Sequence, residues 1–348
     1  MQCPWQDLLS TLGAQCDIGT TIAHFGHRNA EWEALAHEAV VVPIDYYGFI
    51  KLSGEDTRPF LQGQLSSDVR QLDHNSQYSS YSTAKGRVLS TFLLIPQADN
   101  ILLQLPQDLL PDISQRLSKF ILRSKTRAID ASDAWITLGL AGPEAELVAI
   151  KAFTRIPKHT HQIEDFEAGL IVRLPQNRFQ ILVAPPAAIG LFTKLIHAGA
   201  LPAGAPIWTL SDIRAGIPWV DRPIQENFIA QMLNLELLGA VGFDKGCYCG
   251  QEIIARTHYL GKVKRRMYRI QSDALTQCGD ELFTSDSCSQ MSGKVVSAAA
   301  SGTHTWEALA VLQMTDQSTP LQNRQGQAVT LLDLPYRVDD KQYLTTSL

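Results

Sequence analysis

The order of the predicted secondary-structure elements constrains the fold of this chain more than any other feature. Apolar spacing and turn signals predict a first series of elements: a strand at residues 46–52, a helix from residue 56, strands at 78–82, 88–95 and 100–105, a helix at 111–122 and a short strand at 126–129. A similar order recurs: a strand at 135–140, a helix at 142–153, a hairpin of 170–174 and 179–183, and a helix at 186–197. Strand, helix, two strands, helix is the order of a ferredoxin-like α+β unit. The chain is therefore predicted to hold two such units in tandem.

The pattern changes after about Gly261, where short alternating segments are separated by Gly, Ser and Asp turns. The segments 262–270, 293–298, 308–313 and 328–332 predict a small all-β barrel. Between the second unit and this barrel, residues 200–206 read as a connector and residues 225–238 as a helix. The predicted domains are 1–130, completed by 205–258, then 131–204, and finally 259–348.

Composition excludes several classes of protein. Of the 348 residues, 45% are hydrophobic and 19% are charged, which suits packed domains and argues against disorder. The net charge of −5 means that binding to nucleic acid would need a local basic patch. No apolar run approaches the roughly 20 residues of a membrane span, and the first ten residues lack the basic start of a signal peptide. We therefore expect a cytoplasmic protein that does not bind membranes, and we expect a monomer.

The segment richest in chemistry is Lys245-Gly246-Cys247-Tyr248-Cys249-Gly250-Gln251-Glu252. Two glycines bracket a thiol, and a lysine stands two residues before it. If a helix begins at Gly250, its N-terminus and Lys245 would both favour the thiolate of Cys247. A reactive thiol and a tight turn around a buried thiol remain equally open on this ground alone. The four other cysteines are scattered and read as small hydrophobic residues.

This octet resembles a motif of the YgfZ family, the folate-binding relatives of the glycine-cleavage aminomethyltransferase. Four further segments resemble the family in the same order along the chain. They are residues 60–69 (FLQGQLSSDV), 84–87 (AKGR), 213–218 (IRAGIP) and the stretch 234–243 that leads to the octet. The resemblance covers about residues 45–270, whereas the last 80 or so residues are similar only in general character.

The resemblance implies three domains arranged as a ring, with a site for tetrahydrofolate or another reduced folate facing the centre. It also implies a role in maintaining iron–sulfur proteins, among them tRNA-modifying enzymes, with Cys247 as the functional thiol. By the local matches, the two aromatic folate contacts of the family fall on Tyr47 and Trp208. The alternative is that both are ordinary core aromatics. For Tyr47 the two interpretations are equally favoured, and for Trp208 we favour the folate contact.

Several positions depart from the pattern of the enzyme. Ser90 and Thr91 stand where the aminomethyltransferases carry acidic residues, and a hydroxyl cannot replace a carboxylate base near neutral pH. The hairpin at 174–178 lacks the acid that engages the pterin in the enzymes. Asp212 and Arg214 stand where the enzymes have Arg and Glu. We therefore favour a non-enzymatic accessory protein, with a tetrahydrofolate-dependent one-carbon (aminomethyl) transferase as the alternative.

Basic and metal-ligating residues leave other partners open. Two basic clusters could meet the glutamate tail of folate or the phosphates of RNA, although solvated surface is the simpler interpretation. The clusters are Arg116, Lys119, Arg123, Lys125, Arg127 and, after the octet, Arg256, Lys262, Lys264, Arg265, Arg266, Arg269. Direct contact with tRNA thus stays undecided. Cys247, Cys249 and His258 match no standard zinc spacing, so we expect no resident metal, while a transient iron–sulfur contact stays open.

Overall fold

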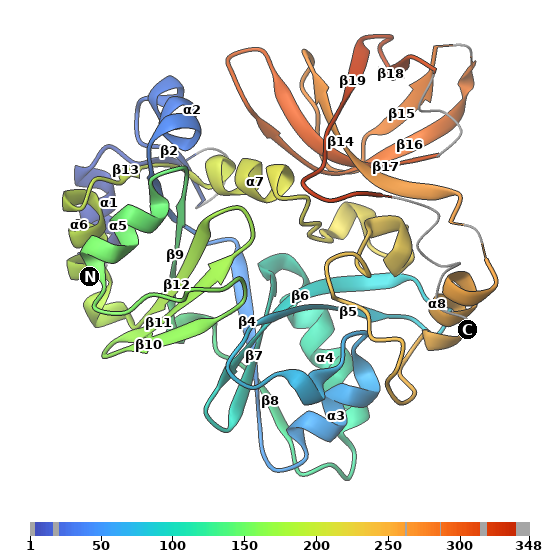
Figure 1. Ribbon diagram of the computed structural model, residues 1–348, viewed down its shortest axis with the longest axis horizontal. Coiled ribbons are helices and arrows are strands. Elements are labelled where there is room, and N and C mark those ends of the chain that lie inside the picture. The colour runs from blue at the N-terminus through green and yellow to red at the C-terminus, as the bar shows by residue number, and fades with distance from the viewer. Residues whose placement is uncertain (1–3, 17–20, 262, 286, 314–318, 339–348) are drawn as a thin grey trace.

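The computed structural model of this protein describes residues 4–16, 21–261, 263–285, 287–313 and 319–338. Two large sheets with flanking helices, a two-stranded ribbon and a closed barrel make up the described part of the chain. In Figure 1 the second sheet lies to the left of helix α7 (Ala205–Arg214), the barrel above it on the right, and the first sheet below. The predicted α+β class with a C-terminal barrel is confirmed.

The first sheet is antiparallel and has the strand order β5-β6-β7-β4-β8. Its strands are β4 (Tyr47–Ser53), β5 (Gln77–Ser82), β6 (Val88–Gln97), β7 (Asn100–Pro106) and β8 (Arg127–Asp130). Helices α3 (Thr57–Gln64) and α4 (Leu110–Ile121) pack on one face, where Leu110, Ile113 and Leu117 recur at helical spacing. The opposite face, with Phe49 and Leu93, joins the largest core of the molecule.

The second sheet has the order β10-β11-β12-β9-β3-β13. Its strands are β3 (Val40–Pro43), β9 (Ile136–Ala141), β10 (Ile163–Phe166), β11 (Gly169–Leu174), β12 (Arg178–Val183) and β13 (Leu201–Pro202). Helices α1 (Pro4–Thr11), α5 (Ala145–Ala152) and α6 (Pro185–His197) cover one face, and α2 (Arg28–His37) stands near its edge (Figure 1). A small ribbon of β1 (Gln15–Cys16) and β2 (Ile22–His24) lies beside it.

One segment assigned to the first unit belongs to the second sheet. Strand β3 lies inside the predicted range 1–130, yet it pairs with β9 in antiparallel fashion and with β13 in parallel fashion. All four residues of β3 are buried, because one face meets the second core and the other the largest core. An apolar run of this kind suits an inner strand of either sheet, and only tertiary packing selects between them.

The segment between the second sheet and the barrel departs most from prediction. Residues 200–206 are not a plain connector, because α7 begins within them at Ala205. The predicted helix at 225–238 is wrong: it contains only a 3-10 turn at Ala230–Leu233, which ends at Asn234 with φ +56°. The amide of Asn234 donates to the carbonyl of Met267 at 2.8 Å, so this polar side chain serves a tertiary contact rather than a helix surface.

The barrel closes in the order β14-β17-β16-β15-β18-β19, with β14 paired to β19. Its strands are β14 (Arg265–Ser272), β15 (Glu281–Thr284), β16 (Ser287–Ala300), β17 (Trp306–Gln313), β18 (Leu321–Asn323) and β19 (Ala328–Leu332). The four predicted segments fall on β14, β16, β17 and β19, although Lys262 lies outside the described residues. None of the helices in the described part of the chain is long and apolar enough to cross a membrane.

Candidate functional site

The cysteine octet forms a loop that leads into helix α8 (Gln251–Tyr259), as predicted from Gly250. Gly250 has φ +83°, and a Cβ there would lie 2.6 Å from the Thr83 carbonyl oxygen and 2.9 Å from the Gly86 Cα atom. Gly86 in turn leaves room for Ile253 of α8. The AKGR turn and the octet, far apart in the sequence, are thus packed backbone to backbone.

The three central residues of the octet differ in exposure. Cys247 is exposed, as predicted for a reachable thiol, whereas Tyr248 is buried. Cys249 is partly buried against the core of the first sheet. Burial raises the pKa of the Cys249 thiol, and Arg116 partly offsets this. Cys247 therefore faces solvent while its neighbour is held by packing.

Lys245 anchors this loop from inside. Its ammonium group donates to the carbonyl oxygens of Leu65 and Ser67, both at 2.7 Å, and lies 4.7 Å from the centre of the Tyr248 ring. Burial lowers the pKa of Lys245 to about 8. These hydrogen bonds tie the octet to the segment 60–69. The octet therefore contacts two of the other segments that resemble the family, 60–69 and 84–87. The predicted stabilisation of the Cys247 thiolate by Lys245 stays a prediction.

The last two residues of the octet begin α8. The backbone N–H of Gln251 donates to the Tyr248 carbonyl at 3.2 Å, and its side-chain amide reaches the Lys245 carbonyl at 3.4 Å. Glu252 is exposed in the first turn of the helix, where an acidic side chain suits the helix dipole. Gln251 therefore closes the loop, and Glu252 faces solvent.

The two aromatic residues predicted to contact folate lie between the sheets. Trp208 is 1% exposed, and its ring packs so closely on Gly139 of β9 that a Cβ there would fall 2.2 Å from it. Tyr47 is buried, its ring is tilted by 40° against that of Trp219 with 4.5 Å between ring centres, and its hydroxyl donates to Asp212 at 3.4 Å. The structure thus places both aromatics around one polar cluster.

A buried ion pair forms the centre of this cluster. Arg178 of β12 donates to Asp212 of α7 at 2.5 Å, and neither side chain is more than 5% exposed. The Trp219 indole also donates to Asp212, at 3.1 Å. The Arg178 guanidinium lies 5.3 Å from the Trp208 ring, and its Nη2 atom has no hydrogen-bond partner among the described residues. A buried guanidinium donor therefore lies beside Trp208 and Tyr78.

Sequence reasoning missed the ion pair, although its signal was present. The hairpin before Arg178 lacks the acid of the enzyme pattern, and Asp212 replaces a base. In this chain Asp212 finds its counter-ion in Arg178, at the end of that hairpin. The third departure, Arg214, binds Glu307 of the barrel at 2.8 Å. The substituted positions thus hold elements together in this chain.

Two further titratable residues near this cluster were also missed. His161 hydrogen-bonds Ser76 at 2.9 Å and meets the Tyr78 ring edge-on; burial, and then Arg178, lower its pKa to about 4. Asp221 has its pKa raised to about 7 by burial and then by Asp108. No local sequence pattern marks either residue, because both environments are built by distant segments.

Ser90 and Thr91, which replace the acids of the enzyme pattern, are buried in β6. The Ser90 hydroxyl donates to the Thr91 carbonyl at 3.1 Å, and the Thr91 hydroxyl accepts from the backbone of Val220 at 3.0 Å. Both hydroxyls therefore serve the backbone, and the Thr91 contact holds the segment that carries Trp219.

The basic clusters are partly used inside the molecule. Arg266 is buried and bonded to Glu236, and Arg269 lies 3.2 Å from Glu307. Lys125 pairs with Glu55 on the surface. His258, one of the three candidate metal ligands, stacks on Phe243 with 3.6 Å between ring centres. Within the described ranges, no three His, Cys, Asp or Glu side chains are grouped as a metal site.

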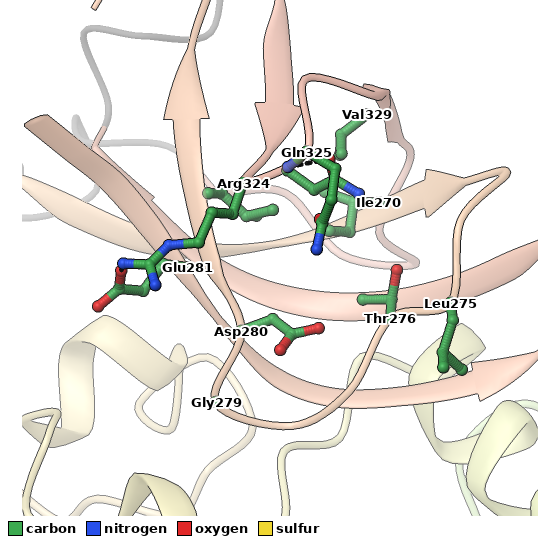
Figure 2. Close-up of a pocket in the computed structure, with 11 residues that line it drawn as sticks. Ile270, Leu275, Thr276, Gly279, Asp280, Glu281, Arg324, Gln325 and Val329 are labelled. Carbon is green, nitrogen blue, oxygen red and sulfur yellow. Dashed lines mark hydrogen bonds and ion pairs between the residues drawn. The ribbon is translucent and has the colours of Figure 1, made fainter. Parts of the chain in front are cut away.

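The cavities lie away from the octet. One cavity, of about 290 Å³, lies at the barrel, and Figure 2 shows Asp280, Glu281 and Arg324 among the residues that line it. A larger one, about 640 Å³, lies between the start of α7 and the barrel and is lined by Tyr46 and Trp306. A cavity of about 180 Å³ adjoins Tyr47 and Trp135. This last cavity touches Tyr47, a residue predicted to bind a ligand.

Comparison with known proteins identifies the family. No protein-family model matches the chain. A tRNA-modifying protein YgfZ of Photobacterium profundum is 30% identical over 315 residues, covering 86% of this chain and 92% of that protein. The YgfZ of Hamiltonella defensa is 32% identical over 238 residues, covering 67% and 70%.

A solved structure shares the fold. The glycine-cleavage aminomethyltransferase T of Bartonella henselae superimposes with a TM-score of 0.81, over 95% of this chain and 96% of that one, at 18% identity. That likeness supports the arrangement of two α+β units and a barrel, and it carries no activity. On the relationship to its sequence relatives, this chain belongs to the YgfZ family.

Proposed function

We propose that this protein binds a reduced folate beside Tyr47 and Trp219 and supports, through Cys247, the iron–sulfur enzymes that modify tRNA. The observation that carries the folate part is the buried cluster between the two sheets, where Arg178 keeps one donor without a partner among the described residues. A flat pterin needs apolar walls and a few fixed polar groups, and this cluster offers both.

The residues present fit such a ligand. Tyr47 and Trp219 supply aromatic surface, and the Arg178 Nη2 atom supplies a buried donor. The cavity of about 180 Å³ is lined by Tyr47 but not by Trp219 or Arg178, so a ligand would reach the cluster past Tyr47. Trp208 is covered by Gly139 and Arg178, so in this proposal it acts on the ligand by holding the guanidinium in place.

Equilibrium dialysis with tetrahydrofolate and 5-formyltetrahydrofolate tests the folate site. We expect saturable binding by the intact protein, severalfold weaker binding by Tyr47→Ala, and unchanged binding by the matched variant Tyr259→Ala, whose tyrosine is 63% exposed on α8. Trp208→Phe should weaken binding less than Tyr47→Ala does. Absence of saturable binding to either folate in the intact protein would remove this part of the proposal.

The thiol part rests on the placement of Cys247. The octet exposes Cys247 and anchors its neighbours, which is the arrangement of a thiol that meets a partner. The relatives bear the name tRNA-modifying protein, which supports tRNA-modifying enzymes as the clients. We propose that the protein works in the cytoplasm as a monomer, and direct contact with tRNA is not required.

Complementation tests the thiol part. In a deletion strain, the intact gene and Cys249→Ser should restore methylthio-modified tRNA nucleosides and iron–sulfur enzyme activity, whereas Cys247→Ser should not. Full restoration by Cys247→Ser would leave the octet as a structural turn. Folate binding by Cys247→Ser separates the two parts, because the proposal predicts that it is unchanged.

The second candidate function is aminomethyl transfer to tetrahydrofolate, which the shared fold favours. The hydroxyls of Ser90 and Thr91 are engaged with the backbone and supply no carboxylate there. We therefore expect no folate-dependent release of ammonia from an aminomethylated carrier protein. Such release, lost on denaturation, would replace our proposal with this one.

A further inference from the structure

The octet holds two cysteines separated by a single residue, and the structure treats them differently. Cys247 is exposed, and Cys249 is partly buried against the first core. Tyr248 between them is 7% exposed and is fixed by the ammonium group of Lys245. The loop therefore carries an accessible thiol with a second thiol beside it.

The covalent geometry of such a pair permits a bond. The Tyr248 side chain is buried, and a turn begins at Cys249, so the two cysteines flank the point where the chain bends toward α8. Two residues apart, Cα atoms are at most about 7.2 Å from one another in a fully extended chain, slightly beyond the disulfide range of about 4.4–6.8 Å. Residues 246–248 lie outside helices and strands, and Gly246 has open space around its Cα, so a slight contraction is feasible.

We propose that Cys247 and Cys249 form a reversible disulfide within the loop when the protein meets hydrogen peroxide. The Cys247 thiolate attacks one peroxide oxygen, which gives a sulfenic acid and releases hydroxide that takes up a proton as water. The sulfur of Cys249 then attacks the Cys247 sulfur, the S–S bond forms, and the sulfenic oxygen leaves as a second water. Two thiols are oxidised, and one peroxide is reduced to two waters.

The other described cysteines are poorer partners. Cys278 belongs to the loop that precedes β15 of the barrel, and burial raises its pKa to about 12. Cys16 is exposed on β1, beside the second sheet, so it can reach Cys247 only from another molecule. A bond within the octet therefore competes chiefly with a bond between two copies.

The inference deepens the proposed function and rests on Cys247 being its functional thiol. A disulfide occupies the Cys247 sulfur and withdraws it from partners, and a dithiol reductant restores it. It also spares Cys247 from the irreversible steps of oxidation that follow a sulfenic acid. The Cys247 thiol would thus be unavailable to partners at high peroxide and available again after reduction.

One peptide reports the bond. Trypsin cleaves after Lys245 and Arg256, so the peptide 246–256 contains Cys247 and Cys249 and no other cysteine. After peroxide treatment and alkylation of the full-length protein, we expect this peptide to lose two hydrogen atoms and to take up no alkyl group. Dithiothreitol should restore two alkylation sites.

Matched variants decide the pairing. In Cys249→Ser, dimedone should label Cys247, and irreversible oxidation of Cys247 should rise severalfold over the intact protein. Cys16→Ser and Cys278→Ser should leave the loop bond unchanged. A Cys247 that ends as sulfinic acid in the intact protein, or that pairs with Cys16 of another copy, would overturn the inference. Complementation by Cys249→Ser is unaffected by that result, so failure here is distinct from failure of the proposed function.

Discussion

At the scale of single residues, the buried ammonium group of Lys245 takes backbone carbonyls as its hydrogen-bond acceptors. The sequence predicts a cation acting on the neighbouring thiol, since the two residues stand close in the chain. In the structure the ammonium group donates to the carbonyl oxygens of Leu65 and Ser67 beneath the loop, and its effect on the Cys247 thiolate stays a prediction. A buried ammonium group is found bonded to acceptors, because the free-energy cost of an unpaired buried donor exceeds the net gain from a typical hydrogen bond.

Replacing Lys245 by Met should lower the free energy of unfolding by about 2 kcal/mol, because two buried carbonyls lose their donor. A pKa of about 8 in the folded state, against 10.5 unfolded, means that the unfolded chain holds the extra proton between these pH values. The contribution of Lys245 to stability therefore rises with pH across that window.

Urea unfolding at pH 7, 8, 9 and 10 measures both effects. The gap between the intact protein and Lys245→Met should widen as pH rises, while Lys85→Met, which removes an exposed lysine of the neighbouring turn, should be near neutral throughout. A gap that narrows with pH would contradict the buried assignment of this lysine.

His161 gives a second pH dependence, of the same sign at lower pH. Its pKa is lowered to about 4 from 6.5, so between these values the unfolded chain binds the additional proton and stability falls as pH falls. His161→Asn should reduce the loss of stability between pH 7 and 4.5 by about 2 kcal/mol, and Asn tolerates the φ of +70° at this position. Exposed His74→Asn is the control, and equal pH profiles for all three proteins would refute the assignment.

At the scale of elements, the start of α8 is where three sequence motifs meet. Gly250 has a positive φ and approaches Thr83 and Gly86, while Lys245 ties the loop to Leu65. The helix itself was predicted from its own sequence, because a helix start after glycine is a local signal. Its packing partners were not predicted, since none of these contacts leaves a periodic pattern.

Gly250→Ala should destabilise the protein by about 2 kcal/mol or more, because an L residue is strained at this φ and its Cβ overlaps the Thr83 carbonyl oxygen. Gly246→Ala, four residues earlier, meets no atom within 4 Å and should be near neutral. Thermal unfolding together with hydrogen exchange of α8 tests the difference. Equal midpoints for the two variants would mean that Gly250 does not form this contact.

At the scale of the molecule, helix α7 connects the second sheet to the barrel. It packs on β9 through Trp208, binds β12 through Asp212, and reaches the barrel through Arg214. Glu307 of the barrel receives both Arg214 and Arg269 and is itself 6% exposed. A charge shared in this way fixes the orientation of the barrel, because one missing partner leaves a poorly solvated charge behind.

Glu307→Ala should lower the free energy of unfolding by about 3 kcal/mol, since two partly buried arginines lose their carboxylate. Glu281→Ala removes the barrel's surface pair with Arg324 and should cost under about 1 kcal/mol. Hydrogen exchange should rise in β17 and α7 of Glu307→Ala only. Unchanged protection of α7 would mean that apolar packing alone holds the barrel.

The sequence by itself determined the element order, the two α+β units, the barrel after residue 261 and the octet that leads into a helix, because periodicity, turn residues and short motifs are local signals. The exposure of the Cys247 thiol was decided by the tertiary structure. Only the tertiary structure decided that β3 joins the second sheet, that residues 225–238 stay irregular, and that Arg178 faces Asp212. Each of these depends on the partner that a buried residue finds across the fold. A strand buried on both faces, an asparagine that donates to a distant carbonyl and a charge that finds its counter-ion all look ordinary in the linear chain.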